Sequence, residues 1–395
     1  MSDTAASARI LVVDDEPDLE LLVRQRFRKK IREGEYDFMF AANGKEALDH
    51  VLTQAPLDVI LCDINMPVMD GLTFLNKLTE LEHVDFRAVI VSAYGDMENI
   101  RVAMNRGAFD FVTKPIDFSD LEVTIEKTLG HVRQLREARL AREQLTKLHR
   151  ELEVAHHIQQ AIIPRKFPAF PDRQEFDIYA EMRPAQHVGG DFYDFFLCGE
   201  NQLGVAIGDV SGKGVPAALL MTASRALLKS LALRGLPPGE CLSLLNAHLC
   251  SENISSMFVS LFYGVLDFST GRFQYATAGH QLPFRIGRHS FSRMERTHGM
   301  VIGVFAAGEY ETGEVTLESG DHLFLYTDGI DEAFNTGEEE YSDERLERLL
   351  RQPDHGGVQQ LVKTVMEDVV LHANGRAQSD DMTILALEYR GGVPS

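Results

Sequence analysis

The sequence predicts a doubly wound α/β domain with five parallel strands, then an α+β domain with helices outside two packed sheets, and a long helix between them. Short apolar runs alternate with amphipathic segments up to Leu121, strand signals are absent from there to Ile163, and many apolar runs follow Pro164. A chain of 395 residues also exceeds what one hydrophobic core normally supports.

We therefore expect domains at residues 1–121 and 164–395, with a helical linker at 122–163. The first domain reads as a parallel sheet with helices on both faces. Its expected strands are Ile10 to Val13, Phe38 to Ala41, Val59 to Cys62, Ala88 to Val91 and Phe109 to Val112.

Polar residues follow the expected strands at their carboxyl ends, where sheets of this kind bind ligands. These residues are Asp14 and Asp15, then Asp63, Ser92 and Lys114. The three acids suit a hard divalent cation such as Mg²⁺, and Asp63 can then accept a phosphoryl group. Ser92 supplies a hydroxyl donor and Lys114 a positive charge for the phosphoryl oxygens. Singly, Asp63 would be a turn cap and Lys114 a surface charge, but their joint order indicates a phosphoacceptor site.

These motifs resemble the receiver domain of bacterial response regulators, which has a flavodoxin-like fold. The resemblance implies that Asp63 is phosphorylated by a sensor histidine kinase or a phosphotransfer protein. The Mg²⁺ ligands that it implies are Asp14, Asp15, Asp63 and the backbone carbonyl of Asn65. The switch residues that it implies are Ser92, Phe111 and Lys114. Phe111 lacks the hydroxyl of the commoner tyrosine, so packing alone would report its movement.

The linker carries apolar residues in alternating steps of three and four. They are Val132, Leu135, Ala138, Ala141, Leu145, Leu148, Leu152 and Ala155. This spacing predicts a coiled-coil seam and a parallel homodimer, with a helix packed on one domain as the alternative. The linker also has a basic stretch, formed by Arg133, Arg136, Arg139, Arg142, Lys147 and Arg150. A solvated helix face explains it best, and docking onto an acidic patch of a partner or of the C-terminal domain is the alternative.

The C-terminal domain combines apolar runs typical of antiparallel strands with separate helical stretches. The expected strands include Phe176 to Met182, Leu203 to Ile207, Met257 to Leu266, Arg272 to Thr277, Leu323 to Tyr326 and Thr383 to Tyr389. The expected helices are Val215 to Leu233, Pro238 to Cys250, Asp343 to Leu350 and Val358 to His372.

Five short motifs at the ends of apolar runs outline one metal site. They are Gly189 to Asp194, Gly208 to Gly214, Ala278 to His280, Tyr326 to Gly329 and Ser379 to Thr383. The candidate ligands are Asp191, Asp209, the carbonyl of Val210, Asp328, and one or both of Asp380 and Asp381. Oxygen ligands without nearby Cys or His favour Mg²⁺ or Mn²⁺ over zinc. Two such cations about 3.5–4 Å apart can activate a shared water for in-line attack on phosphorus, so the motifs predict a hydrolase.

From Glu153 to Tyr389 the chain resembles the metal-dependent Ser/Thr phosphatases of the PP2C type, in the SpoIIE/RsbU-like subfamily that serves sigma-factor partner switching and sporulation. The resemblance rests on the acidic motifs and on the stretch His157 to Pro164 before them. It implies an αββα sandwich, two Mn²⁺ or Mg²⁺ ions, and a phosphorylated anti-anti-sigma (STAS) protein as substrate. We expect phosphorylation of Asp63 to control this phosphatase; whether it activates or inhibits stays open.

A second interpretation is an adaptor that binds a sigma factor or an anti-sigma partner without catalysis. The same architecture occurs in the RssB-type response regulators, and in their enterobacterial form the metal acids are lost. Because this chain keeps its acids, we favour the enzyme. A diguanylate cyclase, suggested by Gly189 to Asp191, does not fit the other motifs.

Several polar residues near the acidic motifs have weaker functional interpretations. His280 can be a general acid but is more often a hydrogen-bonded structural residue. Ser211 and Lys213 mainly fit a tight turn. Arg165 and Arg183 are weak candidates for gripping phosphate.

The composition limits the partners. A formal net charge of −21 argues against nucleic acid and disfavours an anionic membrane surface. The segment Met1 to Ala8 has no signal-peptide core, and no apolar stretch looks long enough to span a bilayer. The four cysteines form no Cys-x-x-Cys pair and are expected to be reduced, as in a cytoplasmic protein.

Overall fold

The computed structural model describes residues 7–391 except 54–55, 82–84, 253–256 and 353–354. Of the segment Met1 to Ala8, residues 1–6 therefore lie outside the described residues. The chain divides into two compact units, Met1–Lys147 and Leu148–Ser395.

The N-terminal unit contains one parallel sheet of five strands in the order β2-β1-β3-β4-β5. Its strands are β1 (Ala8–Val13), β2 (Tyr36–Ala41), β3 (Val59–Asp63), β4 (Arg87–Ala93) and β5 (Asp110–Lys114). Their bounds differ from the sequence prediction by at most two residues. This strand order is that of the flavodoxin-like doubly wound sheets, so the predicted fold class is confirmed.

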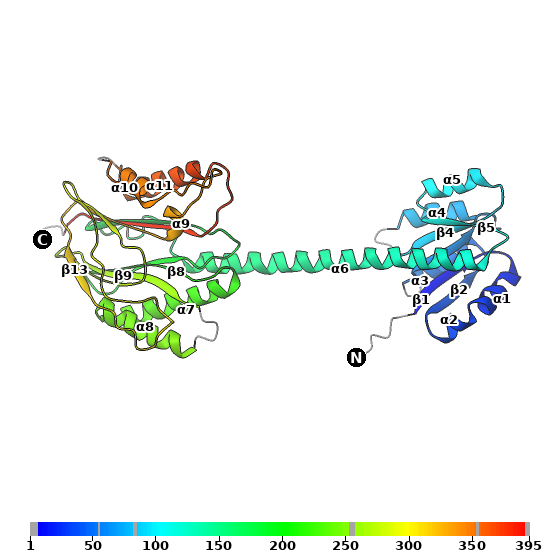
Figure 1. Cartoon of the computed structure of the whole chain (residues 1–395), viewed down its shortest axis with the longest axis horizontal. Helices are drawn as coiled ribbons and strands as arrows, with labels where there is room; N and C mark the ends of the chain where they lie inside the picture. The colour runs from blue at the N-terminus through cyan, green and yellow to red at the C-terminus, as the bar shows by residue number, and fades with distance from the viewer. Residues whose placement is uncertain (1–6, 54–55, 82–84, 253–256, 353–354, 392–395) are drawn as a thin grey trace. The chain divides into compact units, whose positions relative to one another are not determined.

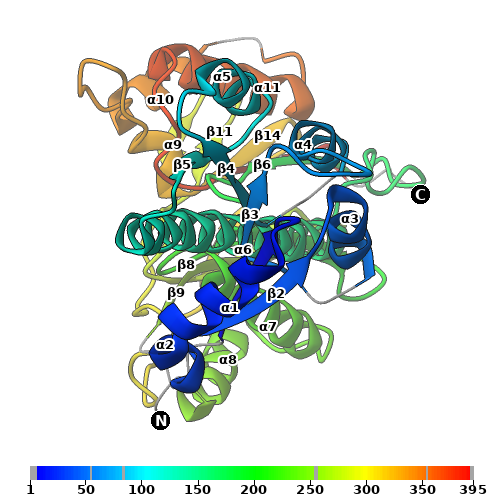
Figure 2. The same cartoon turned by 90° about the vertical axis from the view of Figure 1, so that its right-hand side faces the viewer.

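Helices cover both faces of this sheet, as Figure 2 shows. They are α1 (Pro17–Arg26), α2 (Arg28–Arg32), α3 (Gly44–Thr53), α4 (Gly71–Thr79), α5 (Met97–Asn105) and the first part of α6 (Phe118–Ile162). One core cluster joins α3, α4 and α5 to one face of the sheet, and a second joins α1 and α6 to the other face. The strands are consequently buried on both faces, which explains their continuous apolar runs.

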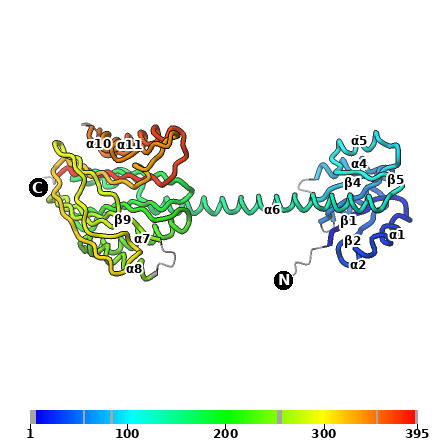
Figure 3. The backbone as a smooth tube through the Cα atoms, viewed as in Figure 1, coloured from blue at the N-terminus to red at the C-terminus, as the bar shows by residue number. Residues whose placement is uncertain are grey.

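The α6 helix runs without interruption from the N-terminal unit into the C-terminal unit (Figure 3). Its first turns bury Leu121, Ile125, Leu129 and Val132 in the N-terminal core, at the spacing of one helix face. Beyond Val132 the apolar seam is largely open to solvent.

The seam residues Ala138, Ala141, Leu145 and Leu148 are exposed. The predicted homodimer would cover them, and it stays a prediction.

Two residues of the basic stretch on α6 bind acids of the N-terminal unit. Arg136 forms an ion pair with Asp58 and donates a 3.0 Å hydrogen bond to the carbonyl of Leu57. Asp58 also accepts a 2.7 Å hydrogen bond from the backbone N–H of Arg9, so it ties α6 to the start of β1. Arg139 pairs with Asp85 at 2.8 Å. Neither interpretation of the basic stretch included this docking on the preceding domain, although Arg139 remains exposed, as on a solvated helix face.

The C-terminal unit consists of two five-stranded antiparallel sheets. The first has the order β13-β10-β9-β8-β7 and the second the order β12-β11-β14-β15-β6. The strands are β6 (Phe176–Arg183), β7 (Phe192–Leu197), β8 (Gln202–Val210), β9 (Val259–Asp267), β10 (Arg272–Ala278), β11 (Phe284–Ile286), β12 (Phe291–Arg293), β13 (Gly313–Thr316), β14 (Asp321–Tyr326) and β15 (Met382–Tyr389).

Helices lie outside the two sheets, as predicted, so this unit is an αββα sandwich (Figure 1). They are α7 (Val215–Ala232), α8 (Pro238–Glu252), α9 (Asp328–Asp331), α10 (Asp343–Leu350) and α11 (Val358–Ala373). The α7 and α8 helices cover the first sheet, and α10 and α11 the second. Strands from both sheets contribute to the main core cluster between them.

Among the residues that the structure describes, one helix, α7, is long and apolar enough to cross a membrane by length and composition. For this segment the expectation that no apolar stretch has that length was therefore wrong. In the fold, α7 buries Ala217, Met221, Leu228 and Leu231 in the core, as a core helix of a sandwich does.

We predict that Arg136→Ala loosens the docking of α6 on the N-terminal sheet. A hydrogen bond to a charged group contributes about 1.5–3 kcal/mol, so the free energy of local opening of residues 118–135 should fall by about that amount. Hydrogen–deuterium exchange of the full chain measures it. Arg142→Ala, at an exposed position of the same helix, is the control. Equal exchange in both variants would contradict the role of Asp58 as the anchor of α6.

Candidate functional sites

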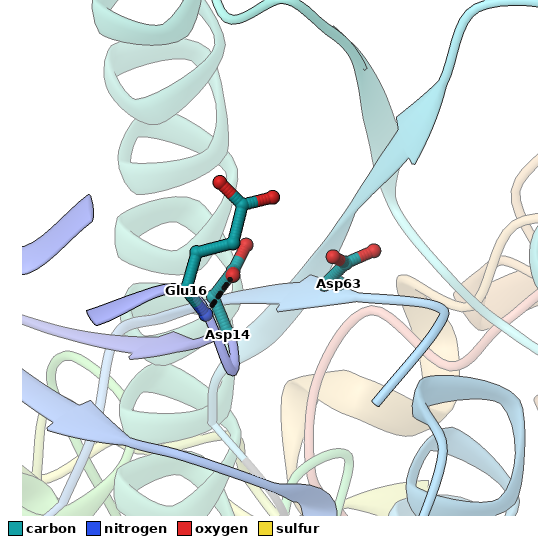
Figure 4. A group of neighbouring side chains, drawn as sticks. All are labelled: Asp14, Glu16 and Asp63. Carbon is teal, nitrogen blue, oxygen red and sulfur yellow. Dashed lines mark hydrogen bonds between the residues drawn. The ribbon is translucent and has the colours of Figure 1, made fainter. Parts of the chain in front are cut away.

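Three carboxylates gather at the carboxyl edge of the N-terminal sheet. Asp14, Glu16 and Asp63 each place one oxygen within 4.8 Å of the others (Figure 4). The cause is the pairing of β1 with β3, which aligns Val13 with Cys62 and so brings the next residues, Asp14 and Asp63, together. Asp15 is exposed and does not belong to this group. Glu16, which the sequence analysis did not single out, does.

Lys114 contacts all three carboxylates but offsets only one of their three negative charges. Its ammonium lies 2.6 Å from Asp63, 2.9 Å from Asp14 and 2.9 Å from Glu16. Burial alone would lower the pKa of this lysine, but the hydrogen bonds to the acids outweigh it and raise that pKa. Lys114 therefore stays charged at any physiological pH, with the acids as its counter-ions.

The other predicted receiver residues lie around Asp63. Ser92 is fully buried at the end of β4, the neighbouring strand, and Phe111 is partly exposed on β5. The backbone N–H of Asn65 points to Asp63, with a nitrogen to oxygen distance of 3.3 Å. A Cβ on Gly71 would lie 2.2 Å from the carbonyl oxygen of Asp63, so only glycine permits this packing of the following loop.

Four of the five acidic motifs meet at one edge of the C-terminal sandwich. In the first sheet, Asp191 comes just before β7, and Asp209 lies at the end of β8, its partner strand. In the second sheet, Asp328 follows β14, while Asp380 and Asp381 precede its partner strand β15. Antiparallel pairing places the end of one strand beside the start of the next, so each sheet contributes two motifs.

Asp191 joins the two sheets. Its Oδ2 accepts hydrogen bonds of 2.7 Å from Thr327 and 2.6 Å from Thr383, the hydroxyls that follow β14 and begin β15. Both threonines stand inside the motifs predicted from the sequence, yet only the fold shows that they orient Asp191.

Asp381 organises the loop that carries Asp191. Its Oδ1 accepts a 2.8 Å hydrogen bond from the N–H of Ala185, and its Oδ2 a 2.7 Å hydrogen bond from that of Gly190. Asp380, by contrast, is partly exposed and lies 3.0 Å from the ammonium of Lys213. The two neighbouring acids therefore differ: the backbone already holds Asp381, whereas Asp380 faces the other carboxylates.

Glycine allows the close approach of these loops. A Cβ on Gly190 would lie 2.6 Å from the carbonyl oxygen of Val210, and one on Gly189 would lie 2.1 Å from Asp381 Oδ2. The Val210 carbonyl consequently lies directly against the loop before Asp191.

The carboxyl groups of this cluster repel one another. Burial, followed by repulsion from Asp209 and Asp381, raises the pKa of Asp191. Burial and repulsion from Asp328 raise the pKa of Asp209 to about 7. Burial and repulsion from Asp380 raise the pKa of Asp328.

Among the described residues, Lys213 is the only cation that forms an ion pair with this cluster. Without bound cations, the surroundings of these carboxyl groups thus disfavour ionisation of all of them at once. Divalent cations bound among them would stabilise the ionised carboxylates. The residues fit such ions: Asp191, Asp209, Asp328 and Asp380, with the Val210 carbonyl, form an all-oxygen set. Bound there, the cations would supply an activated water and neutralise phosphate charge.

Gln159 links α6 to this loop. Its side-chain amide is buried; it donates a 2.7 Å hydrogen bond to the carbonyl of Gly189 and accepts one of 3.1 Å from the Gly189 N–H. Gly189 stands two residues before Asp191. The sequence stretch His157 to Pro164 contains this glutamine, but nothing in its spacing indicated the contact.

His280 is a structural residue in this fold. It is 2% exposed, and its Nδ1 lies 2.8 Å from the Ser260 hydroxyl. Burial lowers its pKa to about 4, and the nearby Tyr326 carbonyl offsets this only in part. A neutral, buried imidazole is a poor general acid at neutral pH. Of the two arginines considered for phosphate, Arg183 pairs with Glu181 at 2.7 Å and Arg165 is hydrogen-bonded to Gln160.

Two family models match the chain. The model described as "Response regulator receiver domain" matches residues 10–126, and the one described as "Stage II sporulation protein E (SpoIIE)" matches residues 199–390. Protein IcfG of Synechocystis sp. is 30% identical over 268 residues, which cover 61% of this chain and 41% of IcfG. The chain thus spans less than half the length of that relative.

The phosphoserine phosphatase RsbU of Bacillus subtilis is 31% identical over 277 residues, covering 69% of this chain and 80% of RsbU. The chain belongs to the RsbU family. Within this family architecture its N-terminal unit is a response-regulator receiver domain and its C-terminal unit is a metal-dependent phosphatase domain of the PP2C type.

A solved structure supports the fold of the phosphatase domain. The PP2C domain of SiaA from Pseudomonas aeruginosa superimposes with a TM-score of 0.55 at 22% identity, covering 62% of this chain and 98% of that domain. The RsbU-family sandwich, with its acids at one edge, is thus built on a known PP2C scaffold.

We predict that Gln159→Ala weakens metal binding by the phosphatase domain. Without the two hydrogen bonds to Gly189, the loop before Asp191 loses its support, and losses of this kind typically cost about 10–100-fold in metal affinity. The Mn²⁺ dependence of p-nitrophenyl phosphate hydrolysis measures it.

Gln144→Ala, at an exposed glutamine of the same helix, is the matched control. An unchanged Mn²⁺ dependence in Gln159→Ala would show that α6 does not support the metal loop.

Proposed function

We propose that the chain is a response regulator whose phosphorylation at Asp63 controls a Mn²⁺- or Mg²⁺-dependent protein Ser/Thr phosphatase. The observation that carries this proposal is the gathering of Asp191, Asp209, Asp328 and Asp380 at one edge of the sandwich. Within this group, the carboxyl pKa values of Asp191, Asp209 and Asp328 are raised. An adaptor without catalysis would not need such a cluster.

The proposed phosphatase ligands are Asp191, Asp209, the Val210 carbonyl, Asp328 and Asp380. Asp381 would mainly hold the loop, because backbone N–H groups already occupy both of its oxygens. Lys213 pairs with Asp380 and would move to a phosphate oxygen or to solvent when a cation binds.

The proposed receiver ligands of Mg²⁺ are Asp14, Asp15, Asp63 and the Asn65 carbonyl. Glu16 is an additional candidate because of its place in the acidic group. The Lys114 ammonium, which pairs with the Asp63 carboxylate, would contact the phosphoryl group once Asp63 carries it. Ser92 and Phe111 would be the switch residues.

The substrate class follows from the family. RsbU is named a phosphoserine phosphatase, and we propose phosphoserine or phosphothreonine on an anti-anti-sigma (STAS) protein as the substrate here. The phosphoryl donor would be a sensor histidine kinase or a phosphotransfer protein. We place the protein in the cytoplasm, where such donors and substrates act.

Regulation would pass through α6. The helix is anchored on the receiver by Arg136 and holds the metal loop through Gln159. A change at Asp63 that shifts the helix or pairs the exposed seams of two chains would alter the support of Gly189. The coupling free energy between two sites that are linked in this way is typically about 1–3 kcal/mol.

Asp209→Ala should abolish Mn²⁺-dependent release of phosphate from a phosphoserine protein. The loss of turnover should exceed the effect of altering a residue that only supports a metal ligand, which is about 10–100-fold. Acetyl phosphate should still phosphorylate the receiver domain of this variant. A malachite green assay measures turnover, and Asp172→Ala, at an exposed acid of the same domain, is the control. Undiminished turnover in Asp209→Ala would refute the metal assignment.

Asp63→Ala should remove any change in phosphatase turnover that beryllofluoride, a phosphoryl mimic, causes in the wild-type chain. The reason is that the mimic binds through the Asp63 carboxylate. The exposed Asp49→Ala variant should respond like the wild type. A response that persists without Asp63 would rule out the receiver as the control point.

A further inference from the structure

A small cavity lies next to the metal acids, among α9, the end of α11 and the loop that leads to β15. Its volume is about 200 Å³. The buried side chains of Ala333, Val369 and Met382 line it from within. An apolar cavity of about 150 Å³ accommodates a benzene-sized group, whereas small-molecule sites usually take about 300–1,000 Å³. The cavity therefore fits one side chain better than a cofactor.

The wall of this cavity is continuous with the metal site. Gly329 lines the cavity and directly follows Asp328, and Ser379 lines it and directly precedes Asp380. A Cβ on Gly329 would lie 1.9 Å from the carbonyl oxygen of Asp381, so the two segments touch there. The cavity is consequently within reach of residues that neighbour a phosphorylated residue bound at the acids.

The mouth of the cavity is apolar and exposed. Phe334 is 37% exposed and Val370 is 46% exposed, and both line the cavity. The Arg376 guanidinium lies 5.4 Å from the Phe334 ring centre and donates a 2.8 Å hydrogen bond to the carbonyl of Asn335. These contacts hold the rim in place, so the cavity is formed before any ligand arrives.

We propose that this cavity binds an apolar side chain of the phosphoprotein substrate, within a few residues of the phosphorylated serine or threonine, and so selects the substrate. The inference rests on the proposed phosphatase function and adds a specificity site to it. We assign a substrate side chain as the occupant because a protein phosphatase brings a polypeptide to the adjoining metal acids in every turnover, and because the volume matches one apolar side chain.

Phosphoserine peptides that differ only in the position of a single leucine test this proposal. In an alanine background, leucine is placed in turn at each of the three positions before and after the phosphoserine. One apolar side chain in a fitting pocket contributes about 1–3 kcal/mol. One leucine position should therefore raise kcat/KM of the wild-type chain about tenfold or more over the all-alanine peptide.

Two variants fill the cavity from its exposed rim, Ala377→Phe and Val370→Trp. Each should remove the leucine preference without changing the hydrolysis of the all-alanine phosphoserine peptide, which has no large apolar side chain to place. Leu233→Phe adds the same ring at an exposed site at the far end of α7 and should keep the preference.

Three results would overturn the proposal: no leucine preference at any position, a preference that survives both filling variants, or an equal loss of turnover on the leucine peptide and on the all-alanine peptide. The last result would mean that the rim acts through the metal site. If the wild-type chain shows no Mn²⁺-dependent hydrolysis of p-nitrophenyl phosphate, the proposed function fails, and the specificity site with it.

Discussion

Mutual repulsion of buried carboxylates is the constraint on which the C-terminal domain depends. Asp191, Asp209 and Asp328 come from three strand ends and are pressed together by the packing of two sheets, with only Lys213 pairing to the cluster among the described residues. Hydrogen bonds from Thr327 and Thr383 offset part of this cost. The arrangement makes physical sense as a site that divalent cations complete.

The receiver also gathers several carboxylates, but there a lysine side chain lies among them. Its three clustered acids share the single ammonium of Lys114, so two negative charges remain uncompensated, which suits a divalent cation. The α6 helix has contacts in both domains. It pairs with Asp58 of the receiver through Arg136 and is hydrogen-bonded to the metal loop through Gln159.

Much of this could be predicted from the sequence because strand periodicity and Asp-Gly motifs are local signals. The receiver strands, four of the five helices described in the sandwich and the acidic motifs were located within a few residues; the one-turn α9 was not predicted. Strand β7 was missed because its run of buried aromatic residues shows no alternation. Strands β11 to β13 were missed because they have only three or four residues each. Glu16, Gln159 and the cavity beside Gly329 depend on contacts between distant segments, which no spacing in the chain encodes.

Anomalous diffraction from crystals grown with Mn²⁺ tests the central claim most directly, because it locates the ions without relying on turnover. The account predicts two manganese peaks within coordination distance of Asp191, Asp209, Asp328 and Asp380, with the Val210 carbonyl facing one of them. Manganese bound only beside Asp63 in the receiver, with none at the edge of the sandwich, would contradict it.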